Sequence, residues 1–216
     1  AAVLLGDYLI SHAFHLCSSL DSQYASRRIG ATTNTVCEGE LLQNRFAGND
    51  ELSEDAYFDI LRRKTGALTA VACELGAKCA GAEPVVVKAM YAYGMSAGVA
   101  FQIVDDVLDV IGDEECVGKT LGRDLTLGKL TLPTLHCLRA SGPETAAKLR
   151  DAIRGSRDVD AATVRTWLEE SGSVEHAVST ARAYVLDATK QLERLAPSEA
   201  TQSLVAVAEF IVARRF

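Results

Sequence analysis

The sequence of 216 residues contains no apolar run long enough to cross a bilayer and no segment resembling a signal peptide. It contains no stripe of basic residues, since acidic residues outnumber basic ones by 29 to 22. It also contains no CxxC pair; six cysteines lie apart, mostly in apolar segments, at Cys17, Cys37, Cys73, Cys79, Cys116 and Cys137. These absences argue against a membrane-inserted protein, a nucleic-acid-binding protein and a zinc or disulfide scaffold. We therefore expect reduced, buried thiols and a cytoplasmic protein.

No segment shows the alternating pattern of a β-strand, and apolar residues recur at helical spacing along the whole chain. The length and the 48% share of hydrophobic residues suit one globular domain with a sizeable core. We predict an all-α helical bundle with a central cavity, forming a single domain over residues 1–216. One helix is expected over about Ser22 to Phe46, a second begins at Ser53 and a third opens at Pro84.

The first residues, AAVLLGDYLI, already lie inside an apolar helical pattern, without a capping residue or an initiating methionine. We therefore expect the domain to be incomplete at its N-terminus, with preceding helices missing. Apolar surface left bare where those helices would pack predicts poor solubility of this stretch alone, or dimerisation through that surface. We expect a homodimer.

Three carboxylates lie in FQIVDDVLDV, a run that is otherwise almost wholly apolar. On a helix Asp105 and Asp109 share a face, with Asp106 beside them. Burying three negative charges among apolar side chains is unfavourable unless a cation compensates them, and oxygen-only ligands suit Mg²⁺. A pair of aspartates at this spacing is, however, more often a solvated helix face than a metal site.

Two lysines follow the aspartates in glycine-bounded loops, Lys119 and Lys129. Lysines that reach the same centre as metal-holding carboxylates form a site for a polyanion, and the ligand this suggests is a diphosphate bridged through Mg²⁺. A third lysine, Lys64, stands just before the apolar stretch ALTAVACELGA, at the border of a buried helix. Beside Arg62 and Arg63 it would ordinarily be taken as surface charge.

The string FQIVDDVLDV followed by GKTLGRDLTLGKLTLP resembles the second aspartate-rich motif of the trans-isoprenyl diphosphate synthases, the polyprenyl synthetase family. The adjacent Lys64 and Thr65 resemble the family's Lys-Thr pair, which grips the allylic diphosphate. The string EGELLQ resembles a helix of medium- and long-chain members. The resemblance implies a helical bundle of the isoprenoid-synthase type. It also implies a prenyltransferase that uses Mg²⁺ to condense an allylic prenyl diphosphate with isopentenyl diphosphate, releasing pyrophosphate.

The resemblance also implies roles for individual residues. It assigns metal binding to Asp105, Asp106 and Asp109, with Asp105 as the best candidate for direct ligation and the other two acting partly through metal-bound water. It assigns catalysis to the three aspartates and to Lys64, Lys119 and Lys129, which would stabilise the leaving pyrophosphate. Substrate binding falls to Lys64, Thr65, Gln102, Lys119 and Lys129.

Part of the family pattern is missing here. Members carry a first aspartate-rich motif and a Gly-Lys-x-x-Arg stretch that holds isopentenyl diphosphate, and the resemblance covers roughly the C-terminal two thirds of a member. We expect little or no activity from this stretch alone. Alternatives are a subunit completed by another chain, a non-catalytic relative, or a class I terpene cyclase, which the GKTLGRDLTLGK continuation disfavours. The EGELLQ string favours a long polyprenyl product, whereas the pathway served is not readable.

Overall fold

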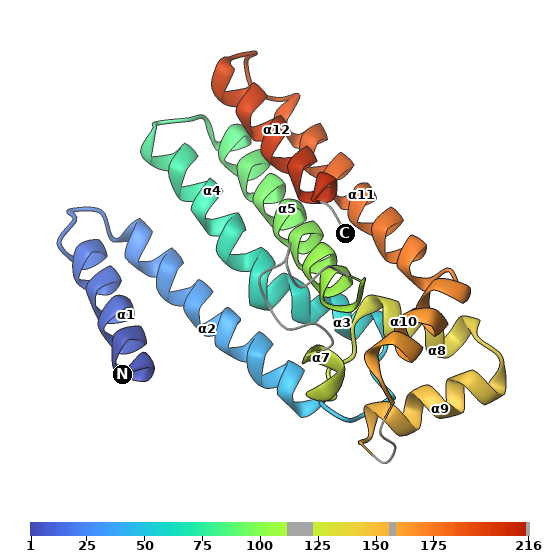
Figure 1. The fold of residues 1–216 in the computed structure, drawn as a ribbon. Coiled ribbons are helices and arrows are strands. Elements are labelled where there is room, and N and C mark those ends of the chain that lie inside the picture. The colour runs from blue at the N-terminus through green and yellow to red at the C-terminus, as the bar shows by residue number, and fades with distance from the viewer. Residues whose placement is uncertain (112–122, 156–158, 215–216) are drawn as a thin grey trace.

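The structure, a computed structural model, describes residues 1–111, 123–155 and 159–214 (Figure 1). Every regular element within those ranges is helical, which confirms the predicted all-α class. The elements are α1 (Ala2–Ser18), α2 (Gln23–Arg45), α3 (Glu54–Leu61), the π-helical turn η1 (Arg62–Gly66), α4 (Ala67–Cys79), α5 (Pro84–Ile111), α7 (Arg123–Thr126), α8 (Leu132–Ala140), α9 (Pro143–Ile153), α10 (Ala161–Glu170), α11 (Ser173–Leu192) and α12 (Glu199–Ala213).

The long helices lie side by side in the order α1, α2, α4, α5 and then α11 with α12, and the shorter α3 and α7–α10 gather at one end (Figure 1). The central helix α5 packs most extensively against α4 and α11. Its fully buried side chains include Val99, Ile103, Val104 and Val107, which recur at helical spacing. The hydrophobic core is therefore built around the same helix that carries the three aspartates.

Helix starts follow local chemistry. Ser22 caps α2 by accepting a hydrogen bond from the Tyr24 backbone N–H, and Ser53 caps α3 in the same way through Ala56. Pro84 is the first residue of α5, a position where its missing N–H costs nothing. All three predicted starts are confirmed.

Two glycines bring α4 and α5 into close contact. A Cβ atom added at Gly94 would lie 2.4 Å from the Thr69 carbonyl oxygen, and one added at Gly98 would lie 2.1 Å from the Thr69 hydroxyl. The Thr69 hydroxyl also donates to the Gly94 carbonyl at 2.8 Å. Side chains at these positions would force the helices apart, so the glycines set the distance between α4 and α5.

A buried ion pair joins α2 to α4. Glu74 accepts hydrogen bonds from the Arg28 guanidinium and from the Tyr24 hydroxyl. Burial alone would raise the pKa of Glu74, but these bonds and the Arg28 charge outweigh it and lower the pKa. The pair borders a pocket of about 410 Å³ between α2, α4 and α5, whose lining also includes Lys78 and Tyr91. Outside the aspartate region, this is a fully partnered charge cluster that fixes α2 against α4.

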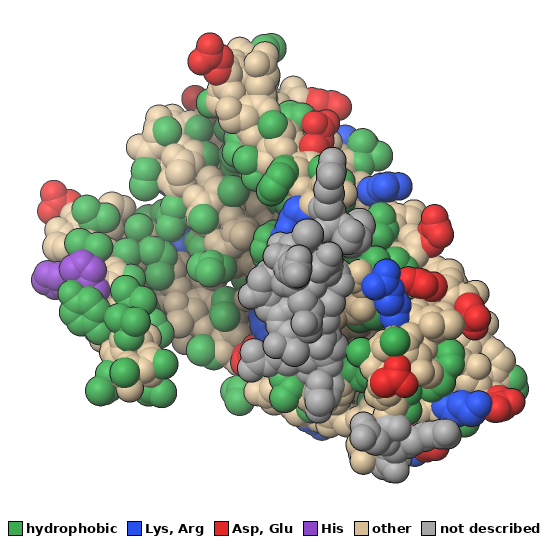
Figure 2. Space-filling view, viewed as in Figure 1, with side chains coloured by type: hydrophobic (Ala, Val, Ile, Leu, Met, Phe, Trp, Pro, Cys, Tyr) green, Lys and Arg blue, Asp and Glu red, His purple; other side chains and the backbone are tan. Residues whose placement is uncertain are grey.

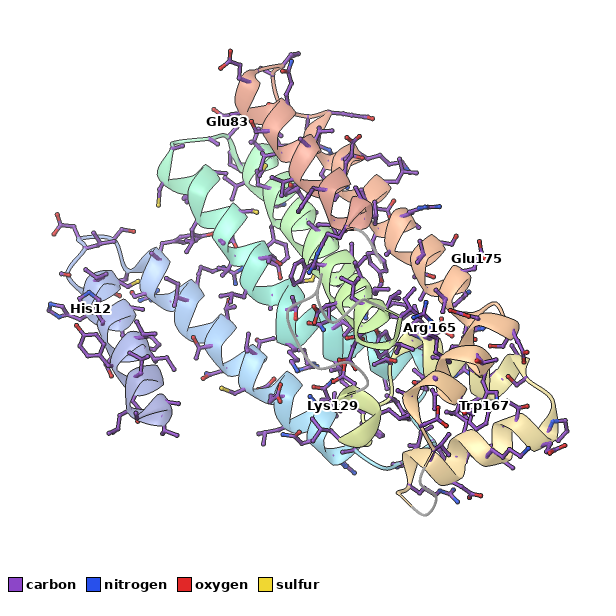
Figure 3. The ribbon with its side chains drawn as sticks, viewed as in Figure 1. His12, Glu83, Lys129, Arg165, Trp167 and Glu175 are labelled. Atoms are coloured by element: carbon purple, nitrogen blue, oxygen red, sulfur yellow. The ribbon has the colours of Figure 1, made fainter. Side chains whose placement is uncertain are left out.

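Helix α1 packs chiefly on α2 and has no buried residue. Figure 3 shows His12 on its outer flank, away from α2. Large apolar side chains that are more than a third exposed lie on α1 and the turn after it: Val3, Leu4, Leu5, Tyr8, Leu9, Ile10, Phe14, Leu16 and Leu20. They form the apolar surface seen around α1 in Figure 2, which we call the α1 surface.

The cysteines correct one expectation from the sequence. Among the described residues all five are free thiols, but Cys37 and Cys79 are exposed and only Cys137 is buried. The prediction of buried thiols was therefore wrong for Cys37 and Cys79, because an apolar neighbourhood in sequence does not say which side of a helix a residue occupies. Within the described ranges, no helix combines the length and the apolar character needed to span a membrane.

Candidate active site

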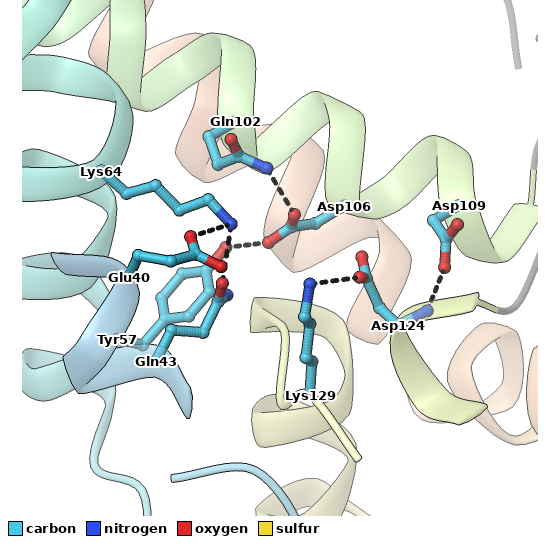
Figure 4. Close-up of polar contacts among 9 residues, drawn as sticks. All are labelled: Glu40, Gln43, Tyr57, Lys64, Gln102, Asp106, Asp109, Asp124 and Lys129. Atoms are coloured by element: carbon cyan, nitrogen blue, oxygen red, sulfur yellow. Dashed lines mark hydrogen bonds and ion pairs between the residues drawn. The ribbon is translucent and has the colours of Figure 1, made fainter. Parts of the chain in front are cut away.

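The C-terminal half of α5 carries a buried carboxylate, Asp106, held by two hydrogen bonds (Figure 4). The Tyr57 hydroxyl donates to its Oδ2 at 2.7 Å, and the Gln102 side-chain amide donates to its Oδ1 at 2.9 Å. Burial raises the pKa of Asp106 to about 7. The charges of Asp124 and Asp105 act in the same direction, and the two hydrogen bonds act against it. A carboxylate in this environment is stabilised by a cation bound nearby.

Gln102 joins Asp106 to the turn that precedes α4. The Thr65 hydroxyl donates to Gln102 Oε1 at 2.9 Å, while Gln102 Nε2 donates to Asp106. Because the amide oxygen only accepts and the nitrogen only donates, the two contacts fix the orientation of the amide. Two residues predicted to bind substrate are thus connected to an aspartate predicted to bind metal.

The third aspartate is tied to one of the predicted lysines. The backbone N–H of Asp124, in α7, donates to Asp109 Oδ2 at 3.0 Å, and the Lys129 ammonium lies 3.7 Å from the Asp124 carboxylate. Gly128 precedes the lysine with φ of 66°, and a Cβ there would lie 2.8 Å from the Gly48 backbone nitrogen. Only glycine suits this conformation and close approach, so the turn that positions Lys129 depends on it.

Lys64 reaches the same region of α5 from a different side than Lys129 (Figure 4). Its ammonium donates to Gln43 Oε1 at 2.7 Å and lies 3.0 Å from Glu40 Oε2, both on α2. Glu40 and Gln43 on α2 thus share one partner, the Lys64 ammonium. Figure 4 shows the ammonium groups of Lys64 and Lys129 both directed toward the row of polar side chains on α5.

Two predicted site residues remain, Asp105 and Lys119. Asp105 is half-buried on α5, one turn before Asp109. Lys119 lies outside the described residues. In the part of the chain that the structure describes, no three His, Cys, Asp or Glu side chains group closely enough to hold a metal ion. The available donors nevertheless fit Mg²⁺, which is commonly held by one or two carboxylates together with phosphate oxygens of a substrate.

Tyr57 is the residue that sequence reasoning missed. It lies in the middle of α3 among apolar side chains, so its pattern is that of a core residue. No local signal in the sequence separates it from a tyrosine that only packs in the core. At the other end of the chain, the Arg214 guanidinium lies over the Phe101 ring, 5.2 Å from its centroid, next to Gln102.

The geometry therefore combines carboxylates on one helix with ammonium groups that reach the same region from two other segments. Carboxylates of this kind bind hard divalent cations, and ammonium groups bind phosphate oxygens as point charges. Such an arrangement suits a ligand that carries several phosphate oxygens. It also suits a reaction in which negative charge develops on such a ligand.

Comparison with known proteins points in the same direction. Residues 1–171 match the polyprenyl synthetase family. An octaprenyl diphosphate synthase from Haemophilus influenzae is 35% identical over 217 aligned residues, which cover 100% of this chain and 66% of the relative. Component 2 of the heptaprenyl diphosphate synthase from Bacillus subtilis is 31% identical, covering 100% of this chain and 61% of the relative. This chain thus spans less than two thirds of the length of either relative.

Solved structures share the fold. A polyprenyl synthase from Caulobacter crescentus, whose crystal structure contains calcium and isoprenyl diphosphate, superposes with a TM-score of 0.94. It is 34% identical, and the match covers 99% of this chain and 66% of the other. A decaprenyl diphosphate synthase from Rhodobacter capsulatus gives a TM-score of 0.91 at 30% identity, covering 99% of this chain and 67% of the other. The helical arrangement is the one expected from the aspartate-rich motif.

Proposed function

Because this chain belongs to the polyprenyl synthetase family, we propose that it is the part of a prenyltransferase that ionises an allylic prenyl diphosphate. The ionised substrate is then extended by isopentenyl diphosphate, with release of pyrophosphate. The observation that carries the proposal is the meeting, at one end of α5, of the hydrogen-bonded carboxylate Asp106 with ammonium groups from two other segments. The shared fold alone would not support this activity, since proteins with one fold can catalyse many different reactions.

Asp105, with Asp106 and Asp109 beside it, would hold Mg²⁺. When bound, the ion would neutralise charge on the diphosphate and on the pyrophosphate that leaves. Asp105 is the best candidate for direct ligation, as the resemblance to the family's aspartate-rich motif implies. In this arrangement Asp106 and Asp109 act partly through metal-bound water.

Lys64, Lys119 and Lys129 would bind the diphosphate and offset the negative charge that grows as the carbon–oxygen bond breaks. Both electrons of that bond leave with pyrophosphate, and an allylic cation remains. The double bond of isopentenyl diphosphate attacks the cation, and loss of a proton restores a double bond in the longer chain. Gln102 and Thr65 would line the site near the reacting carbons, and apolar walls would keep water from the cation.

The test is an assay of the protein expressed from its complete reading frame. With an allylic prenyl diphosphate, labelled isopentenyl diphosphate and Mg²⁺, we expect a longer labelled product and one pyrophosphate released for each isopentenyl unit incorporated, both abolished by EDTA. Pyrophosphate release without use of isopentenyl diphosphate would instead indicate a cyclase. Product chromatography also tests the expected medium- or long-chain product, which the EGELLQ string and the names of the two relatives support.

We propose that the protein is a homodimer. Expressed alone, this stretch should dimerise through the α1 surface, since a bare apolar helix face is costly in water. Replacing Leu5 and Leu9 together by glutamate should raise the dimer dissociation constant by about 100-fold or more, because two charges would be buried in an apolar contact. Sedimentation velocity measures this directly. Leu186→Glu is the matched control, since Leu186 is equally exposed but lies on α11. A wild-type monomer, or equal effects of the two changes, would contradict the assignment.

One relative favours a second arrangement. The Bacillus subtilis protein is named as component 2 of its synthase, so a subunit completed by a different chain is the alternative partner state. In that case the purified protein would show prenyl transfer only after a second component is added. Activity of the purified homodimer would exclude this alternative.

A further inference from the structure

The side chain of Tyr57 is only 2% exposed and is held on several sides. Its ring meets the Phe58 ring edge-to-face, with centroids 5.4 Å apart. Its hydroxyl donates to Asp106 Oδ2 at 2.7 Å. One phenol thus connects α3 to α5 at the point where the aspartates lie.

We propose that Tyr57 is a positioning residue, whose hydroxyl fixes the Asp106 carboxylate and, with it, the geometry of the metal-binding aspartates. The inference rests on the proposed function, and it adds a residue from α3 to a site otherwise built on α5. Tyr57 itself touches neither metal nor substrate. It acts only through Asp106.

The argument for positioning comes from the way the hydrogen bonds are arranged. Each oxygen of Asp106 receives one donor: Tyr57 on Oδ2 and Gln102 on Oδ1. Rotating the carboxylate would break both bonds inside the protein, where unmade hydrogen bonds are costly. Gln102 is held in turn by Thr65, so the chain of bonds has fixed ends on η1 and α3. Without the phenol, one end of this chain is released.

Small displacements matter in such a site. Catalytic groups must be held within about 0.5 Å of the productive geometry, and a misplacement of about 1 Å costs roughly 100-fold in rate. Asp105 adjoins Asp106 in sequence and Asp109 lies within one turn of both, so the three carboxylates would hold the ion together and a misplaced Asp106 would disturb the site that they share. A carboxylate that turns freely would therefore weaken metal binding as well as turnover.

The alternative is that Tyr57 serves only the stability of the core. The chain offers a matched control for this alternative: Tyr93 is also buried, at 3% exposed, and its hydroxyl donates to the Leu204 carbonyl at 2.8 Å. Both changes, Tyr57→Phe and Tyr93→Phe, remove one buried hydroxyl and leave the ring. Their effects on stability should be similar, so a difference in metal binding or turnover belongs to the site.

The experiment compares both variants with the wild type, using protein expressed from the complete reading frame. The first readout is the dissociation constant of Mn²⁺ in the presence of inorganic pyrophosphate, measured by electron paramagnetic resonance. We expect Tyr57→Phe to raise the Mn²⁺ dissociation constant by about five-fold or more and to lower kcat by roughly 10- to 100-fold. Tyr93→Phe should change the Mn²⁺ dissociation constant and kcat by less than about two-fold. Neither variant should change KM for isopentenyl diphosphate by more than about two-fold.

A double-mutant cycle separates action through Asp106 from a general disturbance. In an Asp106→Asn background, Tyr57→Phe should lower kcat by less than about three-fold, because the group on which Tyr57 acts has already lost its charge. Equal effects of Tyr57→Phe and Tyr93→Phe on Mn²⁺ binding would overturn the inference, as would a full additive effect in the cycle. If the wild type transfers no prenyl group, the proposed function fails, and the Mn²⁺ measurement still decides the role of Tyr57.

Discussion

Replacing Asp105 with alanine is expected to lower kcat by about 1,000-fold or more, because it would remove a proposed ligand to the ion that, under the proposed function, stabilises the leaving pyrophosphate. Asp105 is half-buried on α5, and its neighbour Asp106 is fixed by Tyr57 and Gln102. The substitution deletes one carboxylate while that supporting network remains. Steady-state and single-turnover rates at saturating substrate measure the loss in the chemical step. Excess Mg²⁺ should recover little of it.

The matched control for Asp105 is Asp187→Ala. Asp187 lies on α11, its side chain is 62% exposed and it pairs at 3.6 Å with Lys190, so it is an acidic helix residue without a link to the site. Its removal should leave kcat within about two-fold of the wild type, since exposed ion pairs contribute little. Thermal unfolding of both variants checks that each is folded. A near-normal rate for Asp105→Ala would remove it from the metal site.

The helices were predictable from the sequence because their signals are local. The serine caps of α2 and α3 and the proline at the start of α5 act within one turn of the chain, and the pattern of apolar residues acts within one helix. The aspartate motif is a local pattern too, and its three carboxylates lie on one helix, α5, as predicted. By contrast, the close approach of Gly94 and Gly98 to Thr69 on α4 is a contact between two helices, which a pattern within one helix does not specify.

The partners of the site residues were not predictable, because they come from distant parts of the chain. Tyr57 lies 49 residues before Asp106, and Gln43 lies 21 residues before Lys64. No local pattern distinguishes a tyrosine that packs in the core from one that holds a carboxylate. The cysteines show the same limit, since Cys37 is exposed on α2 although a buried thiol was expected there. The packing of α3 against α5 reveals the contact of Tyr57 with Asp106, and the packing of α2 against η1 reveals that of Gln43 with Lys64.

The supporting polar groups also explain why the aspartates can stand in an apolar helix. A solvated face would need no partners, whereas Asp106 is 6% exposed and Asp109 is 3% exposed. Each accepts hydrogen bonds from outside its own turn of α5, from Tyr57 and from the Asp124 backbone. Burying these two carboxylates lowers the stability of the folded protein, even with hydrogen-bond donors in place, whereas carboxylates on a solvated helix face would not lower it. Such an arrangement is typical of a functional site rather than of a surface.

Replacing Lys64 with methionine is expected to lower kcat/KM for the allylic diphosphate by about 100-fold, which corresponds to roughly 3 kcal/mol of lost charge stabilisation. Methionine keeps most of the aliphatic stem and removes only the ammonium group. In the structure that group contacts Gln43 and Glu40, and on binding it would exchange these contacts for diphosphate oxygens. The Mg²⁺ concentration for half-maximal rate should stay within about two-fold, in contrast to Asp105→Ala, because the lysine is not a metal ligand.

Lys148→Met is the control for Lys64. Lys148 also pairs with a glutamate on a helix, Glu144 at 2.6 Å, but it lies on α9 with a side chain 37% exposed, against 27% for Lys64. Its loss should leave kcat/KM unchanged within about two-fold, since a surface pair of this kind is weak. Arginine at position 64 should restore charge but not full activity, because its planar group has a different reach and geometry. If Lys64→Met behaves like Lys148→Met, Lys64 serves only to join α2 to the start of α4. The charge that offsets the leaving pyrophosphate would then have to come from the lysines that follow the aspartates.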